Sequence, residues 1–425
     1  MLVRTPDVGL DNRVRREAES VAKLGHRVVV LTEGTSAVPA PANGVEYVRL
    51  EQPTGVQRRR ARVAERTEGY RRRRSLLTRV RLGWAMATLR VLETGRRVNR
   101  SSPVRSATKW WRLNPSLLRI RFWKLARPAL RELRPDVVHA HDLKTLYAGA
   151  RYRAARLIYD AHEYETQSIA IRSARQRLGA RVFERYGIRR AAAVITVSDG
   201  IADELAELYG IPKPYVVLNT PHAGIADRPI APPLRERAGV VPGDVLLAYV
   251  GRVHPARGTS LLVEALATLD PRFHLAIVGM RASRADDALL AEARAAGVAD
   301  RVHLLPPVPG DDVPALLRGA DVVVLPGAPS CRSYELAMPN KLFEAVQAGV
   351  AIAVSDRRPS MAAFVAAHGL GAAYDVLDPS SLARAIEAAQ AARPDPQELA
   401  DLQRRYSWEA QELVLADVYR AVIAE

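Results

Sequence analysis

The sequence predicts an α/β protein built from two doubly wound parallel sheets. Three observations lead there: the chain has 425 residues, its apolar runs are short and rich in Val and Ile, and helix-like stretches separate them. A chain of this length exceeds one ordinary core, so two domains of about 200 residues are expected. Short continuous apolar runs are typical of strands buried on both faces, and their alternation with helices predicts right-handed βαβ units.

The expected elements follow this alternation along the chain. The strands are 26–31, 137–139, 193–197, 216–218, 246–250, 275–278, 302–305, 322–325 and 351–354. The amphipathic stretches between them include 13–24, 200–208, 289–296, 313–317 and 382–391. Ahead of the turn-forming Thr5-Pro6-Asp7 only four residues remain, so either the first strand is short or the true start lies further upstream. The boundary is expected near 219–222, which gives domains 1–222 and 223–404.

Basic residues are concentrated in one segment. The net charge is +17, and residues 57–134 hold 24 Lys and Arg against four acidic residues, with four of the five tryptophans. Arg beside Trp and Leu favours a helical insertion in the first domain that lies in an anionic membrane interface, where each cation contributes about 1 kcal/mol. A solvated or partner-binding insertion is the alternative. Nucleic-acid binding is not expected, because no nucleic-acid module is visible.

Cysteine usage and hydropathy indicate the compartment. Cys331 is the only cysteine. A single cysteine excludes an intrachain disulfide and fits a reducing compartment, and we interpret Cys331 as a bystander thiol. We expect no signal peptide, because polar residues follow the first three, and no membrane span, because no apolar stretch approaches about 18 residues. The expected location is cytoplasmic, peripheral at the inner face of the cell membrane.

Two loops together predict a binding site for a nucleoside diphosphate. The first, 249–258, follows an apolar run and contains Gly251, Arg252 and Arg257; the second, 335–345, contains Asn340, Lys341 and Glu344. A strand, a tight cationic loop and a helix start together form the usual anion site of α/β proteins, and glycine lets the backbone approach a pyrophosphate. The alternatives are ordinary surface arginines and, for Glu344, a carboxylate that stabilises the start of its helix.

Segments along nearly the whole chain, outside the basic one, resemble family 4 glycosyltransferases. They are 11–18, 24–31, 135–142, 159–163, 193–198, 406–409 and the two loops above, in matching order and spacing. The resemblance implies the GT-B fold, in which the two domains face each other across an interdomain cleft and helix 405–425 packs back on the first domain. It also implies a nucleotide-sugar donor, a retaining transfer aided by the departing phosphate, and no required metal or other cofactor.

The resemblance also assigns roles in donor binding. Arg252 and Arg257 would bind the diphosphate, Glu344 the ribose hydroxyls, and the turn at 338–341 would offer N–H groups. Gly279 would close a neighbouring strand near the donor, and 303–307 would line the base. Two positions depart from the family: Arg257 replaces the usual Lys, and Glu335 lies one place out of register, with eight instead of seven residues before Glu344. A guanidinium can clamp two phosphate oxygens, so the first change preserves function.

Polar residues at two predicted strand ends of the first domain complete the candidate site. Strand alternation puts His139 and His141 on the same side of the sheet, and Asp142, His162 and Glu163 lie nearby. Histidine there can hydrogen-bond the sugar or stabilise developing charge, and His162 and His141 are the preferred catalytic candidates. The same residue types could hold Zn or Mn, but no metal is expected, because an Arg-clamped diphosphate does not need one.

The expected function is transfer of a sugar from a nucleoside diphosphate sugar to a hydroxyl acceptor, in cell-surface polysaccharide or glycolipid synthesis, with lipid-linked acceptors explaining the basic segment. Two alternatives stay open. A sugar-nucleotide epimerase of the same fold would isomerise the donor alone. A non-enzymatic membrane or nucleic-acid binding protein would keep its binding after Arg252→Ala plus Glu344→Ala.

Overall fold

The computed structural model describes residues 1–4, 11–33, 40–50, 115–171, 173–254, 257–327, 331–391 and 395–424. Residues 57–114 of the basic segment and the turn expected at 5–7 lie outside the described residues.

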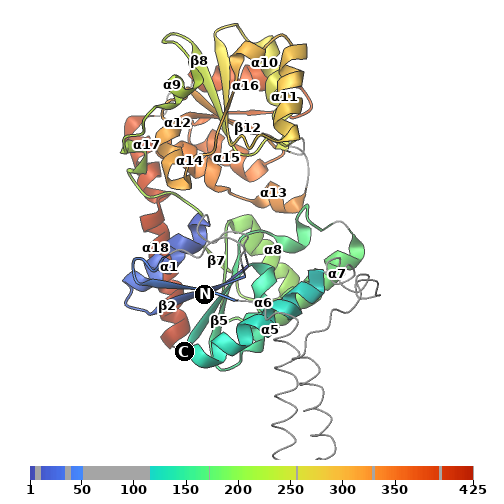
Figure 1. Ribbon diagram of the computed structural model, residues 1–425, viewed down its shortest axis with the longest axis vertical. Coiled ribbons are helices and arrows are strands. Elements are labelled where there is room, and N and C mark those ends of the chain that lie inside the picture. The colour runs from blue at the N-terminus through green and yellow to red at the C-terminus, as the bar shows by residue number, and fades with distance from the viewer. Residues whose placement is uncertain are drawn as a thin grey trace, which may run out of the picture.

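The first domain contains a seven-stranded parallel sheet in the order β3-β2-β1-β4-β5-β6-β7 (Figure 1). Its strands are β1 (Leu2–Val3), β2 (Val28–Thr32), β3 (Val45–Arg49), β4 (Val137–His141), β5 (Arg156–Ala161), β6 (Ala193–Thr196) and β7 (Tyr215–Val216). Its helical segments are α1 (Asn12–Lys23), α5 (Pro115–Leu133), α6 (Asp142–Arg151), η2 (Glu165–Gln167), α7 (Ala174–Ile188) and α8 (Asp199–Tyr209). The strand order reverses between β1 and β4, which is where open parallel sheets bind ligands at their carboxyl ends.

The second domain contains a six-stranded parallel sheet in the order β10-β9-β8-β11-β12-β13. Its strands are β8 (Val245–Val250), β9 (Phe273–Val278), β10 (Val302–Leu305), β11 (Val322–Leu325), β12 (Ala351–Ser355) and β13 (Gly371–Tyr374). Its helical segments are η3 (Ile225–Asp227), α9 (Leu234–Ala238), α10 (Thr259–Thr268), α11 (Arg284–Ala295), η5 (Ala299–Arg301), η6 (Gly310–Asp312), α12 (Val313–Leu317), α13 (Arg332–Leu336), α14 (Asn340–Ala348), α15 (Pro359–Ala367), α16 (Pro379–Ala391) and α17 (Pro396–Arg405). Separate hydrophobic clusters cover its two faces. Two doubly wound parallel sheets are thereby confirmed.

Two strands, β13 and β3, were not among those expected, and β5 was expected only as the strand that ends before His162; each has a local reason. β13 is Gly-Ala-Ala-Tyr, whose small residues favour a strand only weakly. β3 is an edge strand, and only its first residue, Val45, is fully buried. β5 interrupts its apolar run with a fully buried carboxylate, Asp160, which the sheet tolerates because a cation from α1 pairs with it.

The last helix, α18 (Trp408–Ala424), returns from the second domain and packs against the first (Figure 1). Trp408 is fully buried, and its Nε1 donates to Ser20 Oγ of α1 at 3.0 Å. Val418 and Tyr419 join the core cluster of α1 and β2. Burial of this apolar face fixes the end of the chain on the first domain.

Helix α5 is the described part of the basic segment, and it corrects the membrane interpretation for residues 115–133. Phe122, Ala126 and Leu130 are fully buried in the core of the first domain, where α5 contacts α6. This apolar face is therefore not free to enter a lipid interface. Within the described ranges, no helix combines the length and apolarity needed to cross a bilayer.

Contacts on two sides join the domains. On one side, Asp311 of η6 pairs with Arg15 and, at 3.0 Å, with Arg16 of α1. On the other side, the backbone N–H of Tyr164 donates to Ser333 Oγ at 3.1 Å. Leu336 of α13 is buried in the core cluster of the first domain. These contacts link α1 and the residues after β5 in the first domain to η6 and α13 in the second.

Candidate active site

A cavity of about 350 Å³, called here the interdomain pocket, lies between the two domains. The first domain contributes Arg13 and His162, and the second contributes Arg257, Lys341 and Arg358, with other residues of both domains. In the second domain the lining comes from the carboxyl ends of β8 and β11, the loops that follow β8 and β12, helix α13 and the starts of α14 and α15. This is the position at which doubly wound sheets bind their ligands.

Two glycines shape the turns beside the pocket. Gly251 and Gly279 have φ of +153° and +139°. A Cβ on Gly279 would lie 2.5 Å from the carbonyl oxygen of Gly251, and a Cβ on Gly251 would lie 2.6 Å from the Tyr249 hydroxyl. Side chains are excluded at both positions, so the turns after β8 and β9 pack directly on each other.

The two arginines of the first loop lie in different places. Arg257 is half-buried and lines the interdomain pocket. Arg252 is exposed and lines an adjoining cavity of about 510 Å³, which Arg257 and Gly279 also line. The structure therefore places Arg257 between the two cavities and Arg252 at the outer one only.

The start of α14 contributes an asparagine and a lysine to the pocket lining. Asn340 and Lys341 line it, and Glu344 lies one turn further along, where only 6% of the residue is exposed. Asn340 Nδ2 donates to Glu344 Oε1 at 2.9 Å. Burial raises the pKa of Glu344, which nearby Lys341 and Arg16 oppose. Burial also lowers the pKa of Lys341, and Arg257 and Arg358 lower it further against the effect of Glu344.

Glu335 does not take the position expected of it. Its carboxylate pairs with Arg332 at 3.0 Å, and Arg332 also contacts Glu204 of α8 at 2.6 Å. The Glu335 side chain is 43% exposed and does not line the interdomain pocket. The Glu335 carboxylate is thus held by Arg332 of its own helix and lies outside the interdomain pocket, so its expected contact with the donor stays a prediction.

His162 follows β5 and lines the pocket, and the carboxylate of Asp160 balances its charge. Its Nε2 lies 2.8 Å from Asp160 Oδ2, and Arg13 contacts both oxygens of the same carboxylate at 2.9 Å. Burial alone would lower the pKa of His162, but Asp160 and then Asp142 raise it to about 10. Burial opposes ionisation of Asp160, but Arg13 and His162 hold its pKa well below the usual value. At neutral pH His162 is therefore an imidazolium, able to donate a hydrogen bond or stabilise negative charge.

His141 supports this group without lining the pocket. It is 2% exposed, and its Nδ1 lies 3.1 Å from His162 Nε2 and 3.3 Å from Asp160. Its ring stacks on His139 at 4.4 Å, which confirms that the two histidines share one side of the sheet. Burial lowers the pKa of His141. Of the two preferred histidines, only His162 reaches the pocket.

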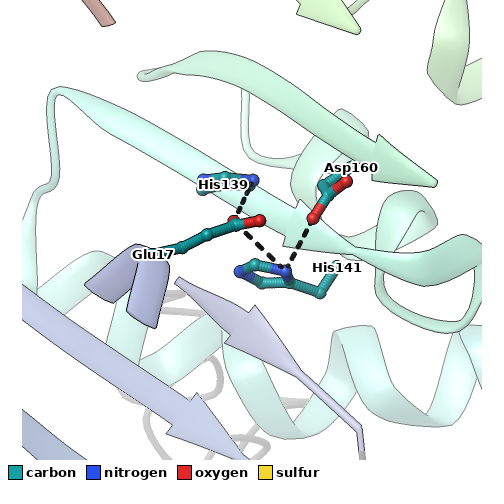
Figure 2. A group of neighbouring side chains, drawn as sticks. All are labelled: Glu17, His139, His141 and Asp160. Carbon is teal, nitrogen blue, oxygen red and sulfur yellow. Dashed lines mark ion pairs between the residues drawn. The ribbon is translucent and has the colours of Figure 1, made fainter. Parts of the chain in front are cut away.

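One group of described residues has ligand atoms close enough to hold a metal ion: Glu17, His139, His141 and Asp160, all within 4.8 Å of one another. Figure 2 shows Glu17 pointing from α1 toward both imidazoles. The set differs from the expected one, because Glu17 and Asp160 take the places of Asp142, His162 and Glu163. Arg13 Nε lies 2.9 Å from both carboxylates of this group, so a fixed cation already balances part of their charge.

The raised pKa of His162 predicts how stability depends on pH. A group whose pKa is higher in the folded state contributes fully below its unfolded value, about 6.5, and loses that contribution as pH rises. We expect the free energy of unfolding in urea to fall between about pH 6.5 and the folded pKa of about 10. His162→Gln should flatten this slope, and an unchanged slope would contradict the assignment.

Three important residues were not singled out from the sequence. Arg13 and Asp160 could have been found, because a carboxylate inside the apolar run Leu-Ile-Tyr-Asp-Ala needs a buried partner, and Arg13 begins the buried face of α1. Arg358 follows β12 in a polar turn whose sequence gives no such signal.

Comparisons with known proteins agree with this geometry. Residues 244–391 match the family described as Glycosyl transferases group 1, and residues 87–221 match Glycosyltransferase Family 4. The D-inositol 3-phosphate glycosyltransferase of Nocardia farcinica is 28% identical over 241 residues, which cover 52% of this chain and 51% of that protein. The chain thus spans about half the length of the curated relatives that it matches.

Solved structures match over nearly the whole chain. Sucrose-phosphate synthase from Thermosynechococcus elongatus superposes with a TM-score of 0.70 at 17% identity, covering 100% of this chain and 96% of that one. HepE from Anabaena, solved in complex with UDP-glucose, gives 0.61 at 15% identity, with 99% and 98% covered. These matches confirm the GT-B fold.

Proposed function

The chain belongs to the family 4 glycosyltransferases, and from this premise we propose that it moves a sugar from a nucleoside diphosphate sugar to a hydroxyl acceptor. The observation that carries the proposal is the charge of the interdomain pocket. Arg257 and Lys341 line it, and among the described residues no carboxylate oxygen lies within 4.0 Å of either cation. Unpaired cations beside a helix N-terminus select an anion such as a diphosphate.

The proposed chemistry uses groups that face the pocket. The departing diphosphate gains negative charge, which Arg257, Lys341 and the N–H groups of the α14 start stabilise more strongly than they stabilise the bound donor. His162 stands on the opposite side as an imidazolium, suited to donate to the sugar or the phosphate and unsuited to act as a general base. Retention of anomeric configuration and independence of a metal are part of this proposal.

The donor class also has support from a neighbour of the same fold, since HepE was solved with UDP-glucose. The test is a thermal-shift series with UDP, GDP and ADP and their common sugars. A ligand at 100 times its Kd stabilises a protein by about 2.7 kcal/mol, so the right nucleotide should stand out clearly. If none of these nucleotides raises the melting temperature, the proposal is wrong. Isomerisation of the sugar without an acceptor would favour an epimerase.

We extend the proposal to the acceptor and location. Residues 57–114 hold 18 Lys and Arg against three acidic residues, a charge suited to an anionic membrane surface. This supports a peripheral enzyme at the inner membrane face that acts on lipid-linked acceptors in cell-surface polysaccharide or glycolipid synthesis. Sedimentation with anionic and zwitterionic vesicles tests it: equal partitioning onto both, or onto neither, would contradict the proposal.

A further inference from the structure

Arg358 is a cation of the interdomain pocket that the donor-binding loops do not account for. It lies in the turn between β12 and α15, and its guanidinium sits 5.0 Å from the centroid of the Tyr334 ring. Its Nη1 also donates to the Tyr334 carbonyl oxygen at 3.5 Å. These contacts hold the guanidinium against the pocket wall and leave its charge uncompensated.

No described acid neutralises Arg358. Within the parts of the chain that the structure describes, no carboxylate oxygen lies within 4.0 Å of it, whereas its neighbour Arg357 pairs with Asp356 at 3.7 Å. Burial lowers the pKa of Arg358; Tyr334, Tyr374 and Cys331 oppose this shift, and Arg257 adds to it. Three cations, Arg257, Lys341 and Arg358, line one pocket and repel one another; Glu163 attracts Arg257 and Glu344 attracts Lys341, but neither acid forms an ion pair with them. Such an arrangement is unfavourable unless a ligand supplies matching charge.

The released nucleoside diphosphate carries more negative charge than the diphosphate of the bound donor, so a third cation would favour the product side of the reaction. The diphosphate of a nucleoside diphosphate sugar carries two negative charges. When the bond between the anomeric carbon and the phosphate oxygen breaks, its electron pair stays on that oxygen, and the anomeric carbon bonds to the acceptor oxygen. The acceptor proton passes to the departing phosphate and then to solvent, because the second phosphate pKa is about 6. The released diphosphate thus carries close to three charges, which three cations match.

We propose that Arg358 is a third catalytic cation, which contacts the terminal phosphate of the departing nucleoside diphosphate and stabilises the charge gained on bond breakage. The inference rests on the proposed function. An interaction that strengthens only as the bond breaks raises kcat and leaves the KM for the donor nearly unchanged.

The test compares Arg358→Gln with Arg358→Lys and with the matched control Arg357→Gln, which removes an adjacent arginine paired outside the pocket. For Arg358→Gln we expect kcat about 100-fold lower, the KM for the donor within about threefold, and product inhibition by the nucleoside diphosphate weakened at least about tenfold. Arg358→Lys should recover part of kcat, and Arg357→Gln should behave like the wild type.

The outcomes separate this inference from the proposed function. If the wild type is active and Arg358→Gln has the same kcat, the inference is wrong but the proposed function stands. Equal weakening of donor and nucleoside diphosphate binding overturns it too, because Arg358 would then bind both states uniformly. A loss confined to donors with an acidic sugar would assign Arg358 to that carboxylate and likewise overturn it. A wild-type protein that binds no nucleoside diphosphate refutes the proposed function, and the inference with it. Arg358→Lys keeps the charge and provides a readout if the glutamine variant folds poorly.

Discussion

Replacing Arg257 by alanine is expected to lower kcat/KM by about 100- to 1,000-fold, the largest effect of any substitution in the donor loops. Arg257 lines both the interdomain pocket and the adjoining cavity. Because no described carboxylate pairs with it, its removal leaves no orphaned acid behind and should barely change the free energy of unfolding. The measurement is steady-state kinetics with the preferred donor, together with loss of the thermal shift that the nucleoside diphosphate produces.

Arg252→Ala is the matched control for this prediction. The sequence gives both arginines the same role, but the structure places Arg252, exposed, at the adjoining cavity only. We therefore expect a much smaller loss for Arg252→Ala, on the order of tenfold or less. Equal losses in the two variants would show that the bound state draws Arg252 into the pocket and would contradict the asymmetry seen here.

Asp160→Asn is expected to destabilise the protein by about 3–5 kcal/mol, because it removes the carboxylate that the buried Arg13 guanidinium contacts through both oxygens and leaves only Glu17 to pair with it. Arg13 is 3% exposed and Asp160 is fully buried, so solvent cannot replace the lost contact. The substitution also removes the carboxylate that keeps His162 protonated, so activity should fall together with stability. Urea unfolding measured by linear extrapolation, alongside kcat, tests both expectations.

Two further variants make the Asp160 result interpretable. Asp142→Asn removes a 25% exposed carboxylate 3.8 Å from His162 Nδ1, and it should cost less than about 1 kcal/mol. Arg13→Met combined with Asp160→Leu should recover part of the lost stability but none of the activity, because both buried charges disappear together. If Asp160→Asn stays within 1 kcal/mol of the wild type, the buried pair does not stabilise the fold as argued.

Helix α5 and Glu335 show what a local sequence pattern does not decide. The amphipathic pattern of 115–133 correctly indicates a helix with one buried face, but it cannot say what buries that face. In the structure this face packs into the core of the first domain, where Phe122, Ala126 and Leu130 are buried, and not against a lipid surface. The position of Glu335 has a related cause: the one-residue shift before Glu344 is visible in the sequence, but the pairing of Glu335 with Arg332, which also contacts Glu204, depends on α13 meeting α8.

The sequence by itself determines the two parallel sheets and the loops that end their strands, because Val-rich runs, strand alternation and glycine turns are local properties of the chain. Gly251 and the start of α14 could therefore be placed without coordinates. Only the tertiary structure decides which charges meet. Arg13 pairs with Asp160 across 147 residues, and Arg358 comes to face Lys341 because β12 lies beside β11. Such encounters depend on strand order and domain contact, which no local pattern encodes.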